Sequence, residues 1–507
     1  MRRSTVFGLS VAGLIFSMVV VAAIADAFAG QTTRVSVNSD GAAANMSTSP
    51  GVLSADGRYV VFWSTATNLV AGVFTSGAHV YRHDRLTGLT VIVSVAMTGN
   101  PGNNVSRDPS ISANGRYVVF TSFATDLVAG GTNGRSQVFV RDMLAGTTAL
   151  VSASSSDVPG DLSSGLSGLG GAHEVSDDGQ HVVFTSFATN LAAGTNNGNQ
   201  QVYVKNMTTR EVVRASVNDA GDAGDRTSQT PVISGDGQLV AFRSESTNFS
   251  PLSTSGIIAQ VFVHDLVDRT TTLESPGAAA VMRHSTVPVL SSDGRYLAFV
   301  SEARLDPRDL DNGTPDVYLK DRDLDTTVLA SLSPNAVSGA VSGGPSISGD
   351  GRWVTFTSID EQIVSGDTNG IVADVFLYDR NSQTVTIASR NDDGVQADRP
   401  SREPSLSGDG SLVVFASSAT NLVPTPFTST TQLYLRQLAD NNVAPTVNLP
   451  SPLDLVFTLT LDATGSFTDP GPAPDETHSA TVNYGDDSDT LDLALDGGSF
   501  ALHHTYA

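Results

Sequence analysis

Nine arginine, carboxylate or imidazole side chains stand a few residues ahead of copies of an Asp-Gly or Asn-Gly dipeptide that recurs along the chain. Gathered at one place, such groups could hold a polar ligand or a peptide by charge-assisted hydrogen bonds. As scattered loop residues they would only keep a large surface soluble. We expect a ligand-binding rim around a central channel, whose members are Arg107, Asp108, His173, Glu174, Arg226, Arg283, His284, Arg402 and Glu403.

Two oxygen-rich phrases, at residues 309–316 and 367–374, could bind a cation. Ca²⁺ takes about six to eight oxygen ligands, and acids spaced two residues apart beside a glycine suit it. Neither phrase has the closing glutamate of an EF-hand, and an Asn-Gly turn forms without a metal. The candidate calcium ligands, which are the one cofactor expectation, are Asp309, Asp311, Asp316, Asp367, Asn369 and Asp374.

Catalytic motifs are missing from the sequence. It has no G-x-S-x-G phrase, no H-E-x-x-H phrase and no G-x-x-x-x-G-K phrase. Of nine histidines, only His173 and His284 lie in loops where they could approach a common ligand. We therefore expect a non-catalytic protein; the rival reading is a polysaccharide lyase or hydrolase that uses a pair such as Glu174 with His284.

An internal repeat must position all of these residues. The Asp-Gly or Asn-Gly dipeptide occurs seven times, at spacings of 58, 64, 58, 57, 57 and 59 residues. A phenylalanine follows at a constant distance in every copy, as Phe62, Phe120, Phe184, Phe242, Phe299, Phe356 and Phe415.

The sequence predicts four short strands in each repeat unit. The first runs into the dipeptide, which we expect to form a two-residue hairpin because both positions accept positive φ. An apolar second strand leaves the turn, and a third strand and a Thr/Val-rich fourth strand follow. Four strands repeated seven times predict an all-β, seven-bladed β-propeller. The seventh unit lacks a fourth strand, so we expect residues 32–37, which match its pattern, to close the last blade and the ring.

The phrases Pro109-Ser-Ile-Ser-Ala-Asn-Gly-Arg-Tyr-Val-Val-Phe120 and Gln137-Val-Phe-Val-Arg-Asp142 resemble the TolB-like, WD-repeat-like propeller repeats of bacterial exported proteins. The resemblance covers about residues 32–438, and we assign residues 30–440 to the propeller. It implies the fold rather than a function, since such propellers serve as binding platforms, enzyme supports and enzymes.

The first 29 residues are typical of a cleaved signal peptide. Arg2 and Arg3 precede an apolar run from Val6 to Ile24, and Ala27-Phe-Ala29 fits a cleavage site. An uncleaved membrane anchor is the alternative. The chain has no cysteine, which excludes disulfides, and its formal charge of −24 argues against nucleic acid as a partner. We expect a secreted or cell-surface protein, with the periplasm as the alternative location.

Residues 441–507 follow an Asn/Pro-rich linker and have a different pattern. The phrases Thr464-Gly-Ser-Phe-Thr-Asp-Pro-Gly471 and Ala480-Thr-Val-Asn-Tyr-Gly-Asp486 resemble a polycystic-kidney-disease-type (PKD) domain, an Ig-like β-sandwich. The family pattern continues into a further strand beyond Ala507, so we expect an incomplete, truncated domain. The resemblance implies a spacer or a protein- and glycan-contacting unit.

The expected function is that of an exported, non-catalytic interaction or scaffold protein. Its propeller loops would bind a protein or polysaccharide partner at the cell surface, without nucleic acid and without a membrane span once the signal is removed. Besides the lyase or hydrolase with a channel site, a periplasmic translocation component of the TolB type is an alternative, which rests on the resemblance alone.

Overall fold

The computed structural model describes residues 30–438 except 73–76, 131, 133, 167–172, 195–197, 253–257, 310–312, 333–340 and 425–429, together with strands between residues 6 and 21 and between residues 446 and 505. The chain divides into two units, one of Gly30–Gln437 and one that combines Met1–Ala29 with Leu438–Ala507.

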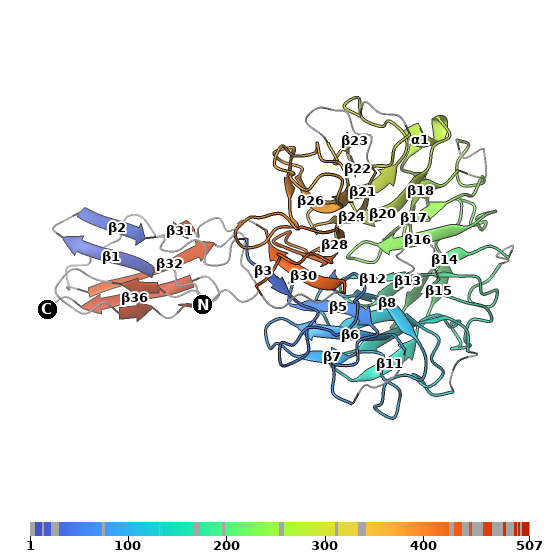
Figure 1. The fold of residues 1–507 in the computed structure, drawn as a ribbon, viewed down its shortest axis with the longest axis horizontal. Coiled ribbons are helices and arrows are strands. Elements are labelled where there is room, and N and C mark those ends of the chain that lie inside the picture. The colour runs from blue at the N-terminus through green and yellow to red at the C-terminus, as the bar shows by residue number, and fades with distance from the viewer. Residues whose placement is uncertain are drawn as a thin grey trace. The chain divides into compact units, whose positions relative to one another are not determined.

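The first unit is a ring of seven four-stranded antiparallel sheets (Figure 1). Blade 1 has β4 (Val52–Leu53), β5 (Tyr59–Ser64), β6 (His79–Asp84) and β7 (Thr90–Ile92). Blade 2 has β8 (Ser106–Ile111), β9 (Tyr117–Ser122), β10 (Gln137–Asp142) and β11 (Thr147–Leu150). Blade 3 has β12 (His173–Val175), β13 (His181–Ser186), β14 (Gln201–Asn206) and β15 (Val212–Arg214).

The remaining blades continue in chain order. Blade 4 has β16 (Ser228–Ile233), β17 (Leu239–Ser244), β18 (Gln260–Asp265) and β19 (Thr271–Leu273). Blade 5 has β20 (Ser285–Leu290), β21 (Tyr296–Ser301), β22 (Asp316–Asp321) and β23 (Thr326–Leu329). Blade 6 has β24 (Ser342–Ile347), β25 (Trp353–Ser358), β26 (Asp374–Asp379) and β27 (Thr384–Ile387). Blade 7 has β28 (Ser401–Leu406), β29 (Leu412–Ser417), β30 (Gln432–Gln437) and β3 (Thr32–Arg34).

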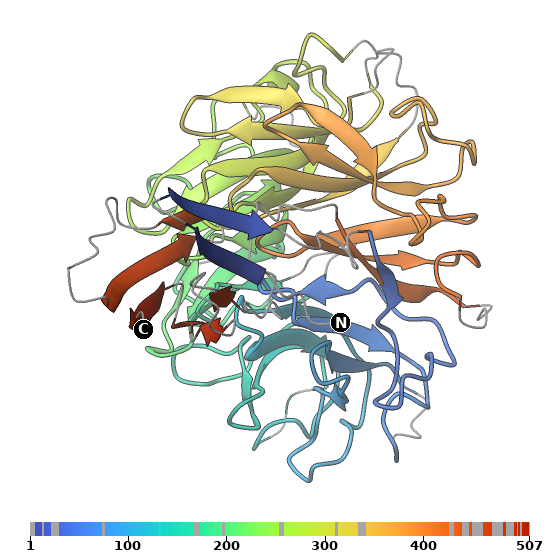
Figure 2. The same cartoon turned by 90° about the vertical axis from the view of Figure 1, so that its left-hand side faces the viewer.

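The N-terminal strand closes the ring as predicted. Strand β3 pairs antiparallel with β30, with Thr32 opposite Arg436 and Arg34 opposite Tyr434. The first strands of successive blades also contact one another all the way round, including β28 with β4. In Figure 2 the blade colours follow chain order around the ring, and the orange seventh blade lies beside the blue first blade. The sequence prediction of seven blades is confirmed.

The repeated phenylalanine lies at the centre of its blade. Phe120 pairs across the sheet with Phe139; both are fully buried, and their ring centroids are 5.8 Å apart. Stacked aromatic pairs add about 0.5–1.5 kcal/mol beyond the area they bury. Equivalent pairs are Phe62–Tyr81, Phe184–Tyr203, Phe242–Phe262, Phe299–Tyr318, Phe356–Phe376 and Phe415–Tyr434.

The dipeptide turn differs from the expected two-residue hairpin. In blade 1 the Gly57 N–H bonds the Ser54 carbonyl, and Ser54 pairs with Tyr59, so four residues form the loop. Gly57 has a φ of +66°, but Asp56 does not enter the left-handed region. The Asp56 carboxylate instead accepts hydrogen bonds from the Ser54 hydroxyl and the Arg58 N–H. The aspartate therefore stabilises the turn through its side chain, in the manner of an Asx-turn.

The same glycine also packs the blades together. A Cβ on Gly115 would overlap the Tyr59 ring of the preceding blade. The contact recurs at every junction, including the one that closes the ring, through the pairs Gly57–Leu412, Gly179–Tyr117, Gly237–His181, Gly294–Leu239, Gly351–Tyr296 and Gly410–Trp353.

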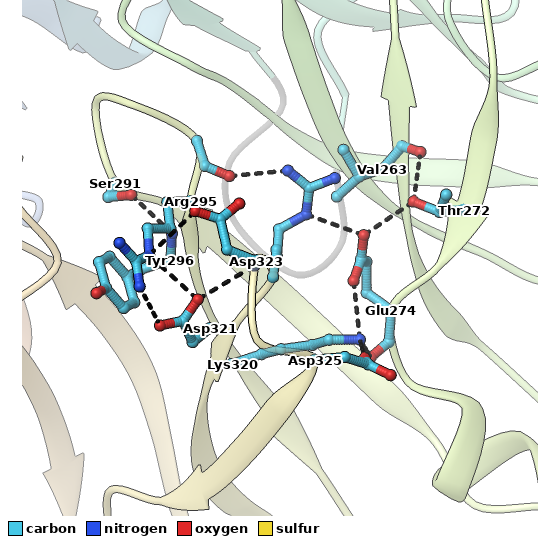
Figure 3. A network of polar contacts seen from close by, with 12 residues as sticks. Val263, Thr272, Glu274, Ser291, Arg295, Tyr296, Lys320, Asp321, Asp323 and Asp325 are labelled. Carbon is cyan, nitrogen blue, oxygen red and sulfur yellow. Dashed lines mark hydrogen bonds and ion pairs between the residues drawn. The ribbon is translucent and has the colours of Figure 1, made fainter.

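A buried ion cluster joins blades 4 and 5 (Figure 3). Lys320 lies 3.0 Å from Glu274 and 2.8 Å from Asp325, and Glu274 is also 2.9 Å from Arg322. Burial raises the pKa of Glu274, but Arg322 and Lys320 outweigh it and hold that pKa below its ordinary value. The carboxylate therefore stays ionised between two cations.

One short helix, α1 (Pro276–Ala280), lies in the loop before β20, where the strand pattern predicted no helix. Within the described part of the chain, no helix combines the length and the hydrophobicity needed to cross a membrane.

The second unit is also made of strands. The apolar segment assigned to the signal peptide forms β1 (Val6–Ala12) and β2 (Ile15–Val21), which pair antiparallel. A four-stranded sheet has the order β31 (Thr446–Asn448), β32 (Thr460–Thr468), β36 (Ser499–Thr505) and β35 (Leu495–Asp496). Strands β33 (Ala480–Val482) and β34 (Leu491–Leu493) form a separate pair. The signal peptide and the PKD-type domain stay predictions.

Candidate ligand-binding site at the central channel

The first strands of the seven blades are innermost and contact one another around the axis of the ring, which has two different ends. We call the end with the Asp-Gly and Asn-Gly turns the hairpin end. The loop end has the loops before the first strands and those between the second and third strands. Along an innermost strand, each residue advances about 3.3 Å from the loop end to the hairpin end.

A ring of backbone hydrogen bonds fixes the hairpin end. Among the described residues, these bonds cross six of the seven junctions between blades. The junction between blades 2 and 3, where Ala113 and Asp177 face each other in the sequence of the ring, has no such bond. The N–H to carbonyl pairs are Ala55–Ala113, Asp177–Gly235, Gly235–Ser292, Ser292–Gly349, Gly349–Gly408 and Gly408–Ala55, at 2.7–3.1 Å. Six of its seven positions carry Ala, Gly or Ser and the seventh is Asp177, and a Cβ on Gly235 would overlap Ser292 and Asp177. Sequence reasoning missed this ring, although the run of Ala, Gly and Ser before the dipeptide was its signal.

Nearer the loop end, five innermost strands carry the same one-residue β-bulge. In β8 the register with β9 shifts between Arg107 and Ser110. Matching shifts occur in β16, β20, β24 and β28. The bulged residue precedes a proline and has a positive φ in each case: Asp108 (53°), Thr230 (46°), Val287 (51°), Gly344 (60°) and Glu403 (54°). Such a conformation costs about 1–3 kcal/mol for a non-glycine residue and occurs where the surrounding structure enforces it, often at functional sites.

Two of the predicted rim pairs sit on these bulges. Asp108 and Glu403 are exposed to solvent. Burial raises the pKa of both carboxyl groups, while the neighbouring Arg107 and Arg402 oppose that shift. The Arg107 guanidinium lies 5.6 Å from the centroid of the Phe123 ring. Blades 2 and 7 therefore present the same Ser-Arg-acid-Pro-Ser phrase at the loop end.

His173 and Glu174 lie deeper in the wall, on β12. The His173 ring is buried, and its Nδ1 is 3.4 Å from the Ser110 hydroxyl of blade 2. Burial lowers the pKa of His173 to about 4. Oε2 of Glu174 accepts the Ile233 N–H of blade 4 at 2.8 Å. Burial, and to a smaller extent Asp177, raises the pKa of Glu174 to about 7 although this donor opposes the shift.

The other three predicted rim residues are in the loops that precede the innermost strands. The Arg226 carbonyl accepts the Gln201 amide at 3.1 Å, and the Arg283 carbonyl accepts the Gln260 amide at 2.7 Å. Nδ1 of His284 accepts the Ala259 N–H at 3.1 Å. The structure thus brings six of the nine predicted residues onto innermost strands and leaves Arg226, Arg283 and His284 in loops.

Five blades share a reciprocal clasp between their two loop-end loops. In blade 2, Oδ1 of Asn103 accepts the Thr125 N–H at 2.9 Å, and Oδ1 of Asp126 accepts the Asn103 N–H at 3.1 Å. The clasp residues that correspond to Asn103 are Asn45, Asp161, Asp225 and Asp398. The recurring Thr-Asn and Thr-Asp dipeptides of the second loop are the sequence signal for this clasp, which the sequence analysis did not use.

The four described acids among the candidate calcium ligands accept hydrogen bonds from protein donors, and Asn369 donates one to Asp374. The Asp374 carboxylate accepts from Ser389 at 2.7 Å, Gln396 at 2.8 Å and Asn369 at 2.9 Å. The other three described acids each accept a hydrogen bond from a side chain. The donors are Tyr318 for Asp309 at 2.6 Å, Ser331 for Asp316 at 2.8 Å and Gln396 for Asp367 at 3.0 Å. In the described ranges, no group of three or more His, Cys, Asp or Glu residues is arranged to hold a metal. Asp311 lies outside the described residues, and the calcium site stays a prediction.

Glutamine occupies the position of Asp316 and Asp374 in four other blades and makes the same bond. Gln137, Gln201, Gln260 and Gln432 each accept a hydrogen bond from the serine that follows the fourth strand of the blade. That serine hydroxyl also accepts a backbone N–H of the third strand, as Ser389 does from Val375 at 3.1 Å. A structural role shared around the ring thus accounts for two of the candidate ligands.

No protein-family model matches the chain, and no curated protein matches it. Among solved structures, it is similar to an oligogalacturonate lyase in complex with manganese, with 14% identity over 82% of this chain and 94% of that chain, at a TM-score of 0.49. A putative TolB from Agrobacterium tumefaciens has 14% identity over 78% of this chain and 91% of that one, at a TM-score of 0.34.

A prolyl endopeptidase has 11% identity over 84% of this chain, at a TM-score of 0.47, and the chain covers 55% of its length. These values carry no argument about function. The propeller fold follows from the strand order of the chain itself.

Proposed function

We propose that the protein is an exported interaction protein whose propeller binds a protein or glycan partner across the loop end of the channel. The clasp in five blades is the observation that carries this proposal. It holds the clasped residues of the two loops together before any partner arrives, so that ordering these residues does not add to the entropic cost of binding. The bulged strands with Arg107, Asp108, Arg402 and Glu403 would offer charged groups at the same end. In this proposal the segment after the propeller acts as a spacer or attachment unit.

The alternative of a polysaccharide lyase or hydrolase draws less support. Its acid–base pair, Glu174 with His284, is engaged by two separate backbone amides, those of Ile233 and Ala259. General acid–base catalysis requires both groups within hydrogen-bond reach of one substrate. A translocation role of the TolB type rests on the sequence resemblance alone.

The proposal is tested with the full chain immobilised and exposed to cell-envelope proteins and to a panel of polysaccharides. A variant with Arg107→Gln and Arg402→Gln removes two charges at the loop end. Its control, Arg210→Gln with Arg269→Gln, removes two charges from turns at the hairpin end. We expect the first variant to lose about tenfold or more in affinity for the captured partner, since charge-assisted contacts are worth about 1.5–3 kcal/mol. Equal binding by both variants would contradict a site at the loop end.

A further inference from the structure

The junction between blades 1 and 2 carries aromatic side chains that the junction between blades 6 and 7 lacks. Blades 2 and 7 present the same Ser-Arg-acid-Pro-Ser phrase at the loop end. The fifth residue of the preceding blade's second strand is Trp63 ahead of blade 2 and Thr357 ahead of blade 7. The residue after the blade's own second strand is Phe123 in blade 2 and Ser418 in blade 7. The two phrases therefore share their charges but differ in their surroundings.

Trp63 lies against the bulged acid of blade 2. Its side chain is partly exposed, and it packs on the apolar cluster that joins blade 1 to blade 2. At the equivalent place, the Thr357 hydroxyl accepts the Glu403 N–H at 3.1 Å, so this position of the repeat contacts the bulged residue of the next blade. Burial raises the pKa of Asp108, and Arg107 and the Trp63 indole N–H both act against that rise. One carboxyl group thus has a cation and an indole as neighbours.

Arg107 holds its guanidinium near the same carboxyl. The guanidinium lies 5.6 Å from the centroid of the Phe123 ring, which is itself partly exposed. Its Nε is buried and has no hydrogen-bond partner among the described residues. A cation over an aromatic face is attracted by the ring, which favours one position of this long side chain. The contact with Phe123 therefore fixes a donor group next to the exposed Asp108 carboxylate.

The chemistry of these groups fits an uncharged ligand rich in hydroxyl groups. Arg107 only donates hydrogen bonds and the ionised Asp108 only accepts them, whereas a hydroxyl group does both. The two charges cancel locally, so neither an acidic nor a basic ligand is favoured by both residues. The formal charge of −24 on the whole chain further disfavours an acidic polysaccharide. The indole and phenyl rings add apolar surface, which suits the C–H face of a sugar ring.

We propose that Trp63, Arg107, Asp108 and Phe123 form a subsite that binds a neutral hexose unit of a glycan. Asp108 accepts hydrogen bonds from the sugar hydroxyls, Arg107 donates to them, and a C–H face of the sugar packs on the exposed part of the indole. The bulge holds Asp108 at a φ of 53° before the ligand arrives, which reduces the ordering cost of binding. The proposal rests on the proposed function and selects a glycan rather than a protein as the partner at the loop end.

The probes are β-linked hexamers of glucose, mannose and galactose, titrated into the full chain by calorimetry. Tryptophan fluorescence is a second readout, because the chain has only two tryptophans and Trp353 lies near the hairpin end against Gly410. We expect at least one hexamer to bind with a Kd of about 1 mM or tighter and to change the emission of Trp63. Trp353→Phe should keep this change. Trp63→Leu should abolish it and weaken binding by about three- to tenfold.

A second variant tests the polar contacts. Asp108→Asn removes the charge of the acceptor and keeps its size, so it should lose about tenfold or more in affinity for the bound hexamer. Its control, Glu211→Gln, removes one exposed acid from the outer turn of blade 3 and should bind as wild type, so both variants change the net charge equally. A hexamer of glucuronic acid should bind more weakly than the neutral hexamers, because Asp108 and the acidic chain repel it.

Four results would overturn the subsite: no neutral hexamer binds, Asp108→Asn and Glu211→Gln have equal effects, the emission change persists in Trp63→Leu, or the acidic hexamer binds most tightly. If the captured partner is a protein that needs Arg107 and Arg402 and is not displaced by any hexamer, the subsite fails and the proposed function stands. If the Arg107 and Arg402 variant binds the partner as well as its own control, the proposed function itself fails.

Thermal melting separates a binding defect from misfolding. A carboxyl group whose pKa is raised in the folded state stabilises the fold below its unfolded pKa, and this contribution is lost as pH rises through the folded pKa. Asp108→Asn should therefore melt at or above the wild-type temperature at about pH 7, and asparagine also tolerates the positive φ. Trp63→Phe keeps an aromatic ring on the apolar cluster and should retain most of the affinity, which provides a folded comparison should Trp63→Leu be unstable.

Discussion

At the scale of single residues, the hairpin glycines show two constraints acting on one position. Gly115 has a positive φ, and its Cα faces the Tyr59 ring of the preceding blade. Gly88 has a similar φ of +74°, but open space surrounds the place of its Cβ. The two positions therefore separate the backbone cost of a side chain from its packing cost.

The first prediction compares alanine at these two positions. Gly88→Ala should destabilise the fold by about 1 kcal/mol, because the left-handed conformation is strained for any residue with a Cβ. Gly115→Ala should cost about 1–3 kcal/mol more, since its methyl group also displaces Tyr59 from the blade junction. Equilibrium urea unfolding measures both. Equal destabilisation would show that the packing constraint is absent.

At the scale of elements, two third strands, β14 and β22, contact the preceding blade through a lysine at their fifth residue. Lys320 of β22 reaches Glu274 and its carbonyl, whereas Lys205, at the same position of β14, donates to the Ala153 carbonyl at 3.0 Å and has no acidic partner within the described part of the chain. Burial lowers the pKa of Lys205. Burial also acts to lower the pKa of Lys320, but Glu274 and Asp325 reverse the direction of that shift. Keeping the lysine at this strand position protonated therefore costs more free energy in β14 than in β22.

The second prediction concerns the ion cluster of Figure 3. Glu274→Ala should cost about 3–5 kcal/mol, because it leaves the buried Lys320 without its main counter-charge. Adding Lys320→Met should recover much of that loss, since a buried pair replaced by apolar groups is often nearly neutral. Asp157→Asn, which breaks the exposed pair with Arg210, is the control and should cost less than about 1 kcal/mol. Chemical unfolding of the three variants checks the order; a double variant no more stable than Glu274→Ala would refute it.

At the scale of the whole molecule, the ring is held by its two ends. Strand β3 supplies the outer strand of blade 7, and Thr32 adds a hydrogen bond from its hydroxyl to the Arg390 carbonyl of blade 6. The hairpin-end ring of backbone bonds and the glycine contacts also pass through the junction of blades 7 and 1. Closure removes the exposed edges that an open array would present.

The third prediction follows from this closure. A variant that begins at residue 45 lacks β3 and leaves the edge of β30 exposed. It should unfold without a single cooperative transition, or aggregate, because an unpaired edge strand templates association. Scanning calorimetry and light scattering against the chain that begins at Gly30 measure this. A sharp transition at the same temperature in both would mean that β3 does not stabilise the ring.

The sequence by itself determined the number of blades, the strand order within each and the closing strand, because the repeat and its alternating apolar residues act over short distances in the chain. Asp108, Glu174 and Glu403, which the sequence assigned to the rim, lie on the first strands of their blades, and their role in binding stays a prediction. It did not reveal the backbone ring, the clasps or the bulges, because these depend on how separate strands and loops meet: the clasps join two loops of one blade, and the ring joins different blades. Only the tertiary structure decided which polar atoms found partners: His284 is engaged by a backbone amide, while Nε2 of His173 has no hydrogen-bond partner among the described residues. Hydrogen-bond satisfaction depends on the relative position of neighbouring blades, which no local pattern encodes.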